Sequence, residues 1–236
     1  MIVERTEHPS WLSNAYLVAD EPGGQGVLID GNGVAGPLLE RIERDEITIA
    51  GVLETHGHPD HVEGLHALAE RFGVDVQGPG KLADDEVVRA GALEIRALST
   101  PGHARDHLAF VVNEAECLTG DVLFRRTVGG TRGGGPTGFA DLRRSIMERL
   151  LALPAETRLH PGHREPTTVA EEWEENPFVR VWRGVDPEGT ETCRVRGEEA
   201  TLVLWAGDYD GGNKAWVRFA SGEDAIVGGS QVERAE

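Results

Sequence analysis

The stretch Thr55-His56-Gly57-His58-Pro59-Asp60-His61 places three histidines and one aspartate within seven residues, directly after the apolar run Ile49-Ala50-Gly51-Val52-Leu53. Such a run predicts a buried strand, so the four ionisable side chains fall in the loop where a strand ends. A neutral imidazole suits a borderline metal ion, and a carboxylate adds charge and can bridge two ions. The first two histidines can converge on one ion, whereas Asp60 and His61 point differently along the turn and can reach a second. The stretch by itself therefore indicates two metal ions side by side.

Three more predicted strand ends carry a residue of the same kind. The segments are Thr100-Pro101-Gly102-His103, Thr119-Gly120-Asp121 and His160-Pro161-Gly162-His163. Loops at strand ends are where a scaffold presents chemistry, and in each of these loops a turn precedes a residue that can bind metal. The repeated arrangement predicts that distant loops complete the site that the first stretch begins.

Strands and helices are interspersed along most of the chain, which indicates an α/β fold. Apolar runs and alternation predict the strands, and apolar residues at helical spacing predict the helices. We expect strands at residues 15–18, 26–29, 50–53, 93–98, 108–112 and 116–118, and helices at residues 35–44, 62–72, 142–153 and 169–175. The glycine-rich segment 129–138 predicts a flexible loop.

From Phe178 on, the sequence pattern changes from interspersed strands and helices to predicted strands alone. We therefore expect a larger domain at residues 1–177 and a small β domain at residues 178–236. The small domain vaguely resembles an SH3-like or Tudor-like barrel.

An alternating pattern in this second part predicts a hairpin. Leu202, Leu204 and Ala206 alternate with their neighbours, and residues 215–219 do the same across the turn Asp210-Gly211-Gly212-Asn213. Another strand is expected at residues 225–227. An isolated hairpin is marginal in water, so we expect the small domain to pack against the larger one or against a second copy of the chain, as a homodimer.

Composition restricts the partners and the location of the protein. The formal net charge is −18, and such a surface repels phosphate backbones and anionic membranes, which argues against a nucleic-acid partner. No window approaches the ~20 apolar residues that a membrane span needs, and the N-terminal residues lack the pattern of a secretory signal. Cys117 and Cys193 are expected to be buried free thiols, so we expect a cytoplasmic protein.

Taken in order, the segments T-H-G-H-P-D-H, T-P-G-H, T-G-D and P-G-H resemble the five-part signature of the metallo-β-lactamase superfamily. The branch that looks closest is the glyoxalase II group of hydroxyacyl-thiol hydrolases, and residues 118–124, 145–154 and 176–178 add to that likeness. The resemblance covers roughly residues 12–178. It implies an αββα sandwich with a dinuclear site on one edge, and hence a catalytic role for the domain at residues 1–177.

The resemblance also implies a role for each residue of ligand type. The first metal ion would be bound by His56, His58 and His103, and the second by Asp60, His61 and His163, with Asp121 bridging both. Two divalent ions are implied, zinc foremost, with iron or a mixed iron and zinc pair as the alternative. His8, His66 and His107 are interpreted as surface or core residues, with support of a ligand as the lesser alternative for His107.

Two such ions lower the pKa of a bridging water from ~15.7 towards ~7, which makes hydroxide available at neutral pH. One ion can also polarise a carbonyl, so hydrolysis of an activated acyl bond needs no serine or cysteine nucleophile. Asp60 and Asp121 are the expected catalytic carboxylates, because Asp60 can orient the hydroxide and Asp121 holds both ions. A thioester suits this site because its thiolate leaves readily. The sequence therefore predicts a metal-dependent hydrolase of small acyl-thiols.

Substrate contacts are expected from arginines in the loop after Asp121. Many single-domain relatives carry a basic residue where this sequence has Gly130, and Arg132, Arg125 or Arg126 can take its place. The chain also lacks the helical C-terminal domain with which two-domain glyoxalase II holds glutathione. These departures concern the thiol carrier and leave thioester hydrolysis in place.

Four other functions share parts of the pattern. A lactonase would use the same hydroxide on a lactone. A persulfide dioxygenase of this fold would bind one iron through His56, His103 and Asp121, and the complete second set of ligands argues against it. An endoribonuclease relative is similar over residues 100–107, but the acidity of the chain opposes it. A non-catalytic binding protein would use the tryptophans of the small domain as a recognition surface, whereas we expect them to pack a core or a dimer contact.

Overall fold

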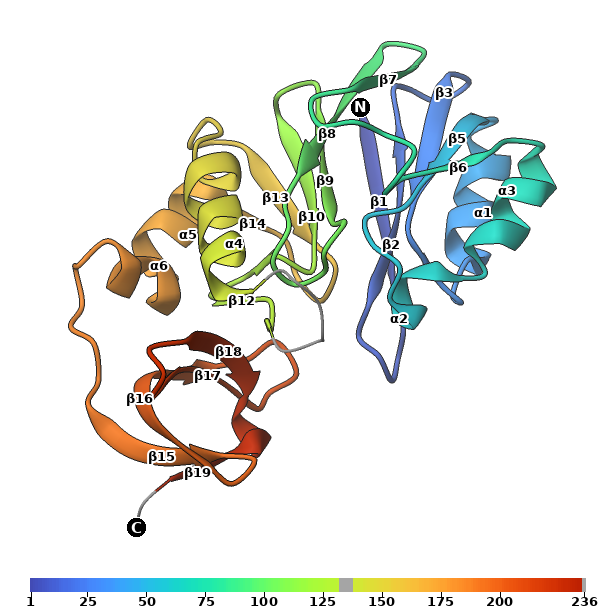
Figure 1. Cartoon of the computed structure of the whole chain (residues 1–236). Coiled ribbons are helices and arrows are strands. Elements are labelled where there is room, and N and C mark those ends of the chain that lie inside the picture. Colours follow the sequence, from blue (N-terminus) through green and yellow to red (C-terminus); the bar gives the residue numbers. More distant parts are fainter. Residues whose placement is uncertain (132–137, 235–236) are drawn as a thin grey trace.

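The computed structural model of the chain describes residues 1–131 and 138–234. Two sheets lie between two sets of helices, so the larger part of the molecule has four layers (Figure 1). This arrangement confirms the αββα sandwich expected from the sequence. Within the described residues, no helix is long and apolar enough to cross a membrane.

The first sheet has the strand order β1-β2-β3-β5-β6. Its strands are β1 (Ile2–Glu7), β2 (Asn14–Ala19), β3 (Gln25–Ile29), β5 (Thr48–Leu53) and β6 (Val76–Gln77). Helices α1 (Gly36–Arg44) and α3 (Leu65–Phe72) cover its outer face. Their apolar sides form one core with the outward residues of the sheet, among them Leu17 and Leu28.

The second sheet has the order β14-β13-β10-β9-β8-β7. Its strands are β7 (Val87–Ala90), β8 (Leu93–Ser99), β9 (Leu108–Val112), β10 (Glu116–Gly120), β13 (Arg158–Pro161) and β14 (Thr167–Thr168). The short hairpin of β11 (Leu123–Phe124) and β12 (Thr127–Val128) follows β10. The outer helices are α4 (Phe139–Arg144), the π-helical turn η1 (Ser145–Leu150), α5 (Val169–Glu175) and α6 (Pro177–Trp182).

The inner faces of the two sheets form the central core. Strand β2 is buried on both faces, because Leu17 points outward to the helices while Tyr16 and Val18 point inward. Phe110 of β9 is among the residues that meet them from the second sheet. Each fully buried large apolar side chain contributes about 1.5–3 kcal/mol, so this layer fixes how the two sheets face each other.

The predicted helix at residues 62–72 is interrupted in the structure. Helix α2 (Pro59–Val62) ends at Glu63, and Gly64 takes a left-handed conformation with φ 76° before α3 begins. The interruption lets the chain pair with β4 (Gly31–Asn32) through bridges to Val62 and Glu63. A Cβ on Gly31 would lie 2.7 Å from the Glu63 carbonyl oxygen, so only glycine permits this approach. The pairing fixes the segment that carries Asp60 and His61.

The segment after Asn176 also differs from the expectation. Phe178, where the sequence pattern changes, lies in the first turn of helix α6. The Asn176 side chain caps the N-terminus of this helix and accepts a hydrogen bond from the Phe178 N–H at 3.0 Å. Phe178 and Trp182 belong to the core of the sandwich. The first strand of the C-terminal sheet begins only at Glu191, and we call residues 191–234 the C-terminal unit.

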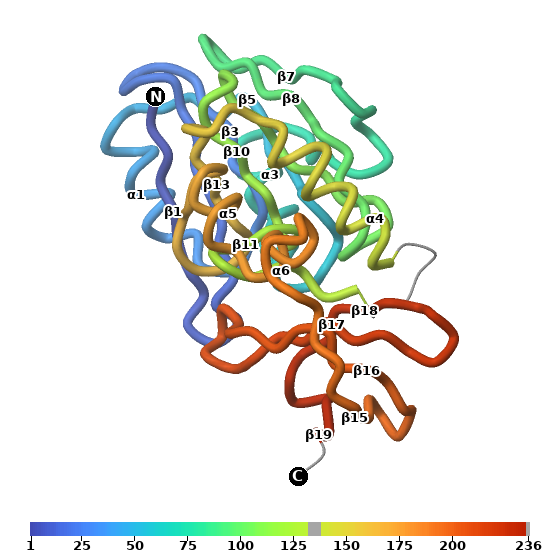
Figure 2. Tube along the Cα trace, turned by 90° about the vertical axis from the view of Figure 1, so that its left-hand side faces the viewer, coloured from blue at the N-terminus to red at the C-terminus, as the bar shows by residue number. Residues whose placement is uncertain are grey.

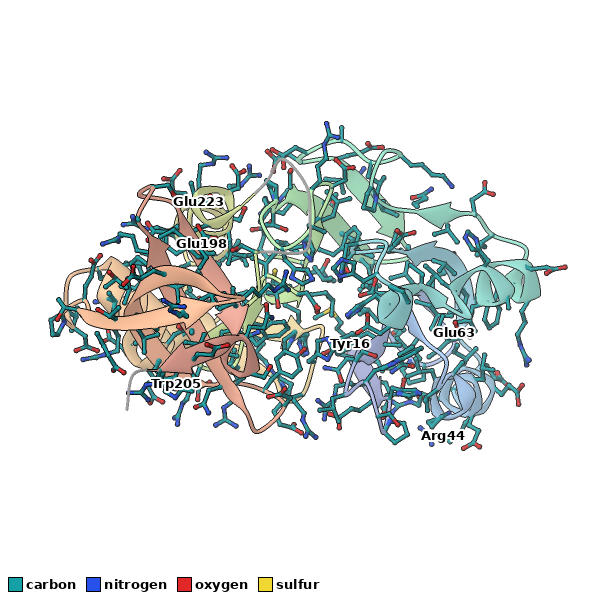
Figure 3. All side chains as sticks on the ribbon, turned by 60° about the horizontal axis from the view of Figure 1, so that its bottom comes forward. Tyr16, Arg44, Glu63, Glu198, Trp205 and Glu223 are labelled. Carbon is teal, nitrogen blue, oxygen red and sulfur yellow. The ribbon has the colours of Figure 1, made fainter. Side chains whose placement is uncertain are left out.

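The C-terminal unit is a curled five-stranded sheet of order β18-β17-β16-β15-β19. Its elements are β15 (Glu191–Val195), β16 (Glu198–Gly207), β17 (Asn213–Phe219), β18 (Asp224–Gly228), the 3-10 turn η2 (Gly229–Gln231) and β19 (Val232–Arg234). The predicted hairpin is β16 and β17, which pair antiparallel. Figures 2 and 3 show the unit against one end of the sandwich.

A break of register in β16 gives the unit two apolar surfaces. The pairing with β17 shifts between Leu202 and Leu204, so the predicted common face of these residues is split. Leu202 packs into the unit's own core, whereas Val203, Leu204 and Ala206 pack into the core of the sandwich. The C-terminal unit therefore shares a continuous apolar core with the larger part of the chain.

Candidate metal centre

Loops from both sheets meet at one edge of the sandwich. Backbone hydrogen bonds hold them together, from Leu108 N–H to the Thr55 carbonyl at 2.9 Å and from Gly162 N–H to the Gly120 carbonyl at 2.8 Å. This edge brings together all seven predicted ligand residues in two groups. The first group comprises His56, His58, His103 and Asp121, and the second comprises Asp60, His61 and His163; within each, the ligand atoms lie within 4.8 Å of one another.

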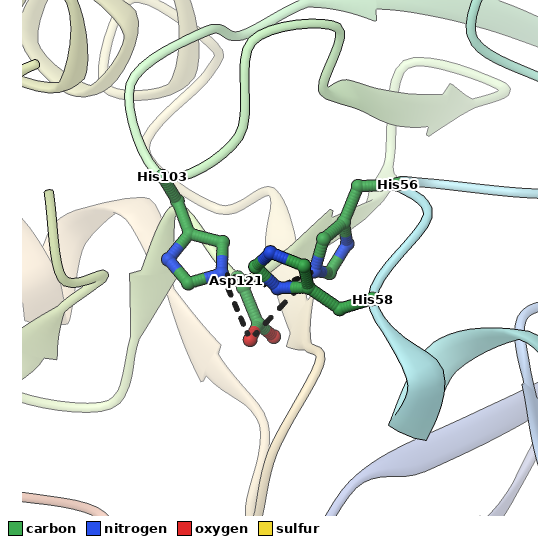
Figure 4. Close-up of side chains that lie close together, drawn as sticks. All are labelled: His56, His58, His103 and Asp121. Carbon is green, nitrogen blue, oxygen red and sulfur yellow. Dashed lines mark hydrogen bonds and ion pairs between the residues drawn. The ribbon is translucent and has the colours of Figure 1, made fainter. Parts of the chain in front are cut away.

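The first group is a cluster of three imidazoles beside one carboxylate (Figure 4). His58 Nδ1 lies 3.0 Å from His56 Nε2 and 3.0 Å from His103 Nε2. Asp121 Oδ2 lies 4.0 Å from His56 Nε2 and 3.6 Å from His103 Nε2. The ligand atoms converge on one region of space.

The second group reaches the same carboxylate from the other side. Asp121 Oδ1 lies 3.2 Å from His61 Nε2, and Asp121 Oδ2 lies 3.3 Å from His163 Nε2. Asp60 Oδ2 lies 3.6 Å from His61 Nε2 and 3.5 Å from His163 Nε2. Asp121 thus stands between the two groups, in the position of a bridging ligand.

Three polar atoms of this centre lack the partners that burial demands. Among the described residues, His61 Nε2, Asp121 Oδ1 and His163 Nδ1 are buried and have no hydrogen-bond partner. The first two lie 3.2 Å from each other. A buried polar atom without a partner costs about 1–3 kcal/mol, and a cation between the imidazole and the carboxylate removes that cost. Histidine nitrogen and carboxylate oxygen are also the donors that zinc and iron accept. The residues present fit two divalent ions.

The electrostatics of the centre keep several donors in the form that binds metal. Burial lowers the pKa of His56 and of His103, so both rings are neutral at neutral pH. Burial by itself would raise the pKa of Asp121, but the rings of His61 and His163 outweigh it and hold that pKa well below its usual value. The Asp121 carboxylate and the neutral rings of His56 and His103 are therefore ready to bind a cation without first losing a proton.

Asp30 supports His61 from behind, and the sequence analysis did not identify it. Its carboxylate accepts hydrogen bonds from the Thr55 N–H and hydroxyl, both at 2.8 Å, and lies 3.1 Å from His61 Nδ1. Despite the burial of His61, its pKa is raised well above the usual value by Asp121 and Asp30. Asp30 directly follows β3, as Asp121 directly follows β10, and that shared position was the available signal.

His107 supports Asp121 instead of serving only as a surface or core residue. Its Nε2 accepts the Asp121 backbone N–H at 3.1 Å, and its Nδ1 lies 2.9 Å from the Thr100 hydroxyl. Because a backbone N–H can only donate, Nε2 carries no proton and Nδ1 donates to Thr100. Burial lowers the pKa of His107 to about 3, which keeps this arrangement at neutral pH. The contacts therefore favour the lesser of the two interpretations of His107, that it supports a metal ligand.

Glycines allow the loops to approach one another at the centre. A Cβ on Gly162 would lie 2.2 Å from Asp121 Oδ1 and 2.8 Å from His61 Cε1. Gly120 adopts a positive φ of 48°, and a Cβ there would lie 2.5 Å from His107 Nε2. The glycines of the T-G-D and P-G-H segments are therefore required for the ligand geometry itself.

A cleft of ≈ 310 Å³ opens beside the second group. Its lining residues are Arg125, His163, Arg164, Glu165 and Tyr209. Arg125, one of the predicted substrate contacts, is exposed there and has no ion-pair partner among the described residues.

The other predicted arginines are placed differently. Arg126 faces away from the cleft lining, because its guanidinium pairs with Glu175 and its backbone N–H donates to Glu172. Arg132, together with most of the predicted loop at residues 129–138, lies outside the described residues.

An αββα sandwich with a histidine and aspartate cluster at one edge defines a class of metal-dependent enzymes. The chain belongs to the metallo-beta-lactamase superfamily, whose family description matches residues 9–86. It is 32% identical to a hydroxyacylglutathione hydrolase of Bradyrhizobium sp. (strain ORS 278), over 80% of this chain and 72% of that protein.

Solved structures agree with this assignment. ETHE1 from Myxococcus xanthus is 31% identical and superposes with a TM-score of 0.69, over 76% of this chain and 84% of that one. TTHA1623, solved in a di-iron-bound form, is 31% identical with a TM-score of 0.63, over 75% of this chain and 100% of that one. The recognition of the family from the sequence motifs is confirmed.

Proposed function

We propose that the chain is a dinuclear metallohydrolase that cleaves small acyl thioesters of the hydroxyacyl-thiol type. The observation that carries the proposal is the meeting of two ligand groups at one shared carboxylate, Asp121. The likeness to a hydroxyacylglutathione hydrolase supports the choice of a thioester. A cytoplasmic location is part of the proposal and rests on two buried free thiols, Cys117 and Cys193.

The assignment of ligands is also part of the proposal. His56, His58 and His103 would hold one ion, and Asp60, His61 and His163 the other, with Asp121 shared. When bound, two such ions supply an activated water at neutral pH and polarise the scissile carbonyl. Zinc is the proposed metal, and the di-iron form of TTHA1623 makes iron, alone or mixed with zinc, the alternative to measure.

The protein's own residues supply orientation and proton handling. The Asp60 side chain is 25% exposed, more than Asp121 at 7%, so it lies on the solvent side of the centre, where it can accept a hydrogen bond from the attacking water. Neither cysteine can act as the nucleophile, because both are buried in cores and burial raises the pKa of the Cys117 thiol to about 12. Attack by water therefore accounts for hydrolysis best.

The charges of the cleft bear on the thiol carrier. Arg164 is paired with Glu7 at 3.1 Å, whereas Arg125 lacks such a partner among the described residues. One unpaired cation at the mouth of a small cleft fits a thiol carrier with a carboxylate near its sulfur. We therefore assign Arg125, and not Arg126, as the contact for the anionic end of the substrate.

The second candidate functions are a lactonase and a persulfide dioxygenase. A lactonase would need the same residues, and substrate selection alone separates it from the thioesterase. A dioxygenase would need only His56, His103 and Asp121 around one iron. The assembled second group, with its support from Asp30, favours the dinuclear hydrolase.

The test is elemental analysis of the full-length protein after loading with zinc and iron, followed by a panel of substrates. We expect close to two metal ions per chain and fastest turnover on a 2-hydroxyacyl thioester, compared with lactones of the same acyl size. One iron per chain together with oxygen uptake on a persulfide would establish the dioxygenase instead. Metal-loaded protein that turns over none of the panel would remove the proposal.

A further inference from the structure

We propose that the turn between β16 and β17 of the C-terminal unit, residues 208–212, completes the substrate cleft, and that Tyr209 positions the thiol portion of the substrate beside the metal centre. The identity of the substrate rests on the function proposed above. The position of Tyr209 rests on contacts alone.

Tyr209 contacts a candidate ligand directly. Its ring stacks on the ring of His163, with centroids 4.3 Å apart and planes 16° from parallel. Its ring also neighbours Phe124 of β11, with centroids 4.8 Å apart, and Lys214, whose Nζ lies 5.4 Å from the ring centroid. Tyr209, His163 and Arg125 all line the same cleft. A group bound in this cleft therefore lies beside Tyr209 and beside a candidate ligand of the second group.

A buried ion pair fixes the turn that carries Tyr209. Lys214 Nζ lies 3.0 Å from Asp208 Oδ2, and the two side chains are only 9% and 7% exposed. Asp208 Oδ1 also accepts the Tyr209 N–H at 2.8 Å, and Arg164 Nε donates to the Tyr209 carbonyl at 3.2 Å. A buried ion pair is weak evidence for stability, but it specifies one geometry. Here it specifies the geometry of a turn that would otherwise be an ordinary polar hairpin end.

The same unit also reaches the first ligand group. Ile226 of β18 exchanges two hydrogen bonds with Thr131, one from its N–H to the Thr131 hydroxyl at 2.9 Å and one from the Thr131 N–H to its carbonyl at 3.0 Å. The neighbouring Gly130 carbonyl lies 3.0 Å from His103 Nδ1, which donates to it. The C-terminal unit is thus in contact with one ligand, His163, and is linked to another, His103, through Thr131 and Gly130.

Rigid docking makes Tyr209 suitable as a positioning residue. Trp216 of β17 stacks on Phe139 of α4 with centroids 4.9 Å apart, and both belong with Trp182 to the shared core. A side chain on a rigid element holds its geometry better than one on a free loop. The hydroxyl of Tyr209 has no hydrogen-bond partner in the parts of the chain that the structure describes, so we assign the contact to the ring.

The test measures thiol binding and turnover on the full-length, metal-loaded protein. Calorimetric titration with N-acetylcysteine, a small thiol with a carboxylate, gives an affinity that does not depend on catalysis. Loss of one aromatic contact surface corresponds to roughly a tenfold weaker Kd, so we expect that change for Tyr209→Ala. The Michaelis constant for a thioester should rise by a similar factor while kcat stays within about threefold. Tyr209→Phe keeps the ring and should bind N-acetylcysteine within about twofold of the parent protein.

The control is Glu223→Gln, an exposed position between β17 and β18 that is not part of the cleft lining, and it should bind N-acetylcysteine as the parent protein does. Unchanged affinity and Michaelis constant in Tyr209→Ala, with both metals retained, would overturn the inference. Loss of metal from Tyr209→Ala would also overturn it, because Tyr209 would then serve to hold His163 and not the substrate. If the parent protein cleaves no thioester, the function proposed above fails, while the difference in N-acetylcysteine affinity still decides the role of Tyr209.

Discussion

The two ligand groups share Asp121, yet the chain holds them in different ways. In the first group, the ligand nitrogens of His56 and His103 both lie 3.0 Å from His58 Nδ1. In the second group, Asp30 lies 3.1 Å from His61 Nδ1, and the Tyr209 ring of the C-terminal unit covers His163. A carboxylate at a strand end thus orients a ring of the second group, whereas no carboxylate contacts the far side of a ring in the first group among the described residues.

The difference implies different sensitivity to change. A substitution of Asp121, or of Gly120 or Gly162 beside it, should weaken the binding of both ions. Beyond that, changes at a distance from the centre should affect the second ion more than the first. Four substitutions test this contrast.

Asp121→Ala should abolish the centre. Because one carboxylate faces both groups, we expect loss of both ions and a fall in hydrolysis of about 1000-fold or more, since metal assistance supplies several kcal/mol. Metal content and kcat/KM give the measurement. His66→Ala, at an exposed position of α3, is the matched control and should keep both ions. Retention of both ions in Asp121→Ala would refute the shared-ligand assignment.

Trp216→Ala should loosen the C-terminal unit. Trp216 is 3% exposed and packs against Phe139 and Trp182, so its removal should lower the free energy of unfolding by about 3 kcal/mol. Urea denaturation provides the measurement. The control is Trp11→Ala, because Trp11 is 42% exposed and its loss should cost less than about 1 kcal/mol. Equal costs for the two changes would mean that the unit does not depend on the shared core.

Asp30→Ala should separate the two groups. His61 loses the carboxylate that orients its ring, and loss of such support weakens metal binding by about 10–100-fold. We expect a competing chelator to remove the second ion at a lower concentration than the first, because Asp30 reaches the first group only indirectly, through the Thr55 hydroxyl that lies 3.0 Å from His56 Nδ1. Asp30→Asn keeps an acceptor for the Thr55 N–H and should show a smaller loss. Equal weakening of both ions would contradict the contrast between the groups.

The smallest effect, counted per pH unit, is that of acid on His107. The pKa of His107 lies at about 3 in the folded chain, against an ordinary value near 6.5, so only the unfolded chain takes up this proton between those values. The stability of the metal-free protein should therefore fall as the pH decreases below about 6.5, by at most about 1.4 kcal/mol per pH unit from this group. Urea titrations at several pH values should show a shallower decline in His107→Gln. An identical decline in both proteins would show that His107 is not buried in its neutral form.

The sequence was sufficient for what local pattern determines. The loops that follow apolar runs predicted the seven ligand residues, and the alternation of apolar residues predicted the hairpin of β16 and β17. It was insufficient where long-range packing overrides local pattern. Helical spacing at residues 62–72 did not reveal that Gly31 and Gly64 let two segments pair, and alternation did not reveal the shift after Leu202.

The sequence did not predict two residues of the site, Asp30 and Tyr209, because the role of each depends on contacts with distant segments of the chain. Asp30 acts through a backbone with φ 58° that points its carboxylate under His61, and no periodicity encodes that direction. Tyr209 sits in a turn whose composition is typical of any exposed hairpin. Only the docking of the C-terminal unit, through Trp216 and Ile226, places it on His163.

The order of these residues along the chain has a consequence for the synthesis of the protein. A chain emerges from the ribosome N-terminus first, and domains fold largely as they appear. His56, His58, His103 and Asp121 emerge well before His163, and Tyr209 follows later still. We therefore expect the ligands of the first ion to be present on a growing chain before those of the second, and the substrate cleft to be complete only after the C-terminal unit has docked. Acquisition of substrate binding would then report that the C-terminal unit has been made.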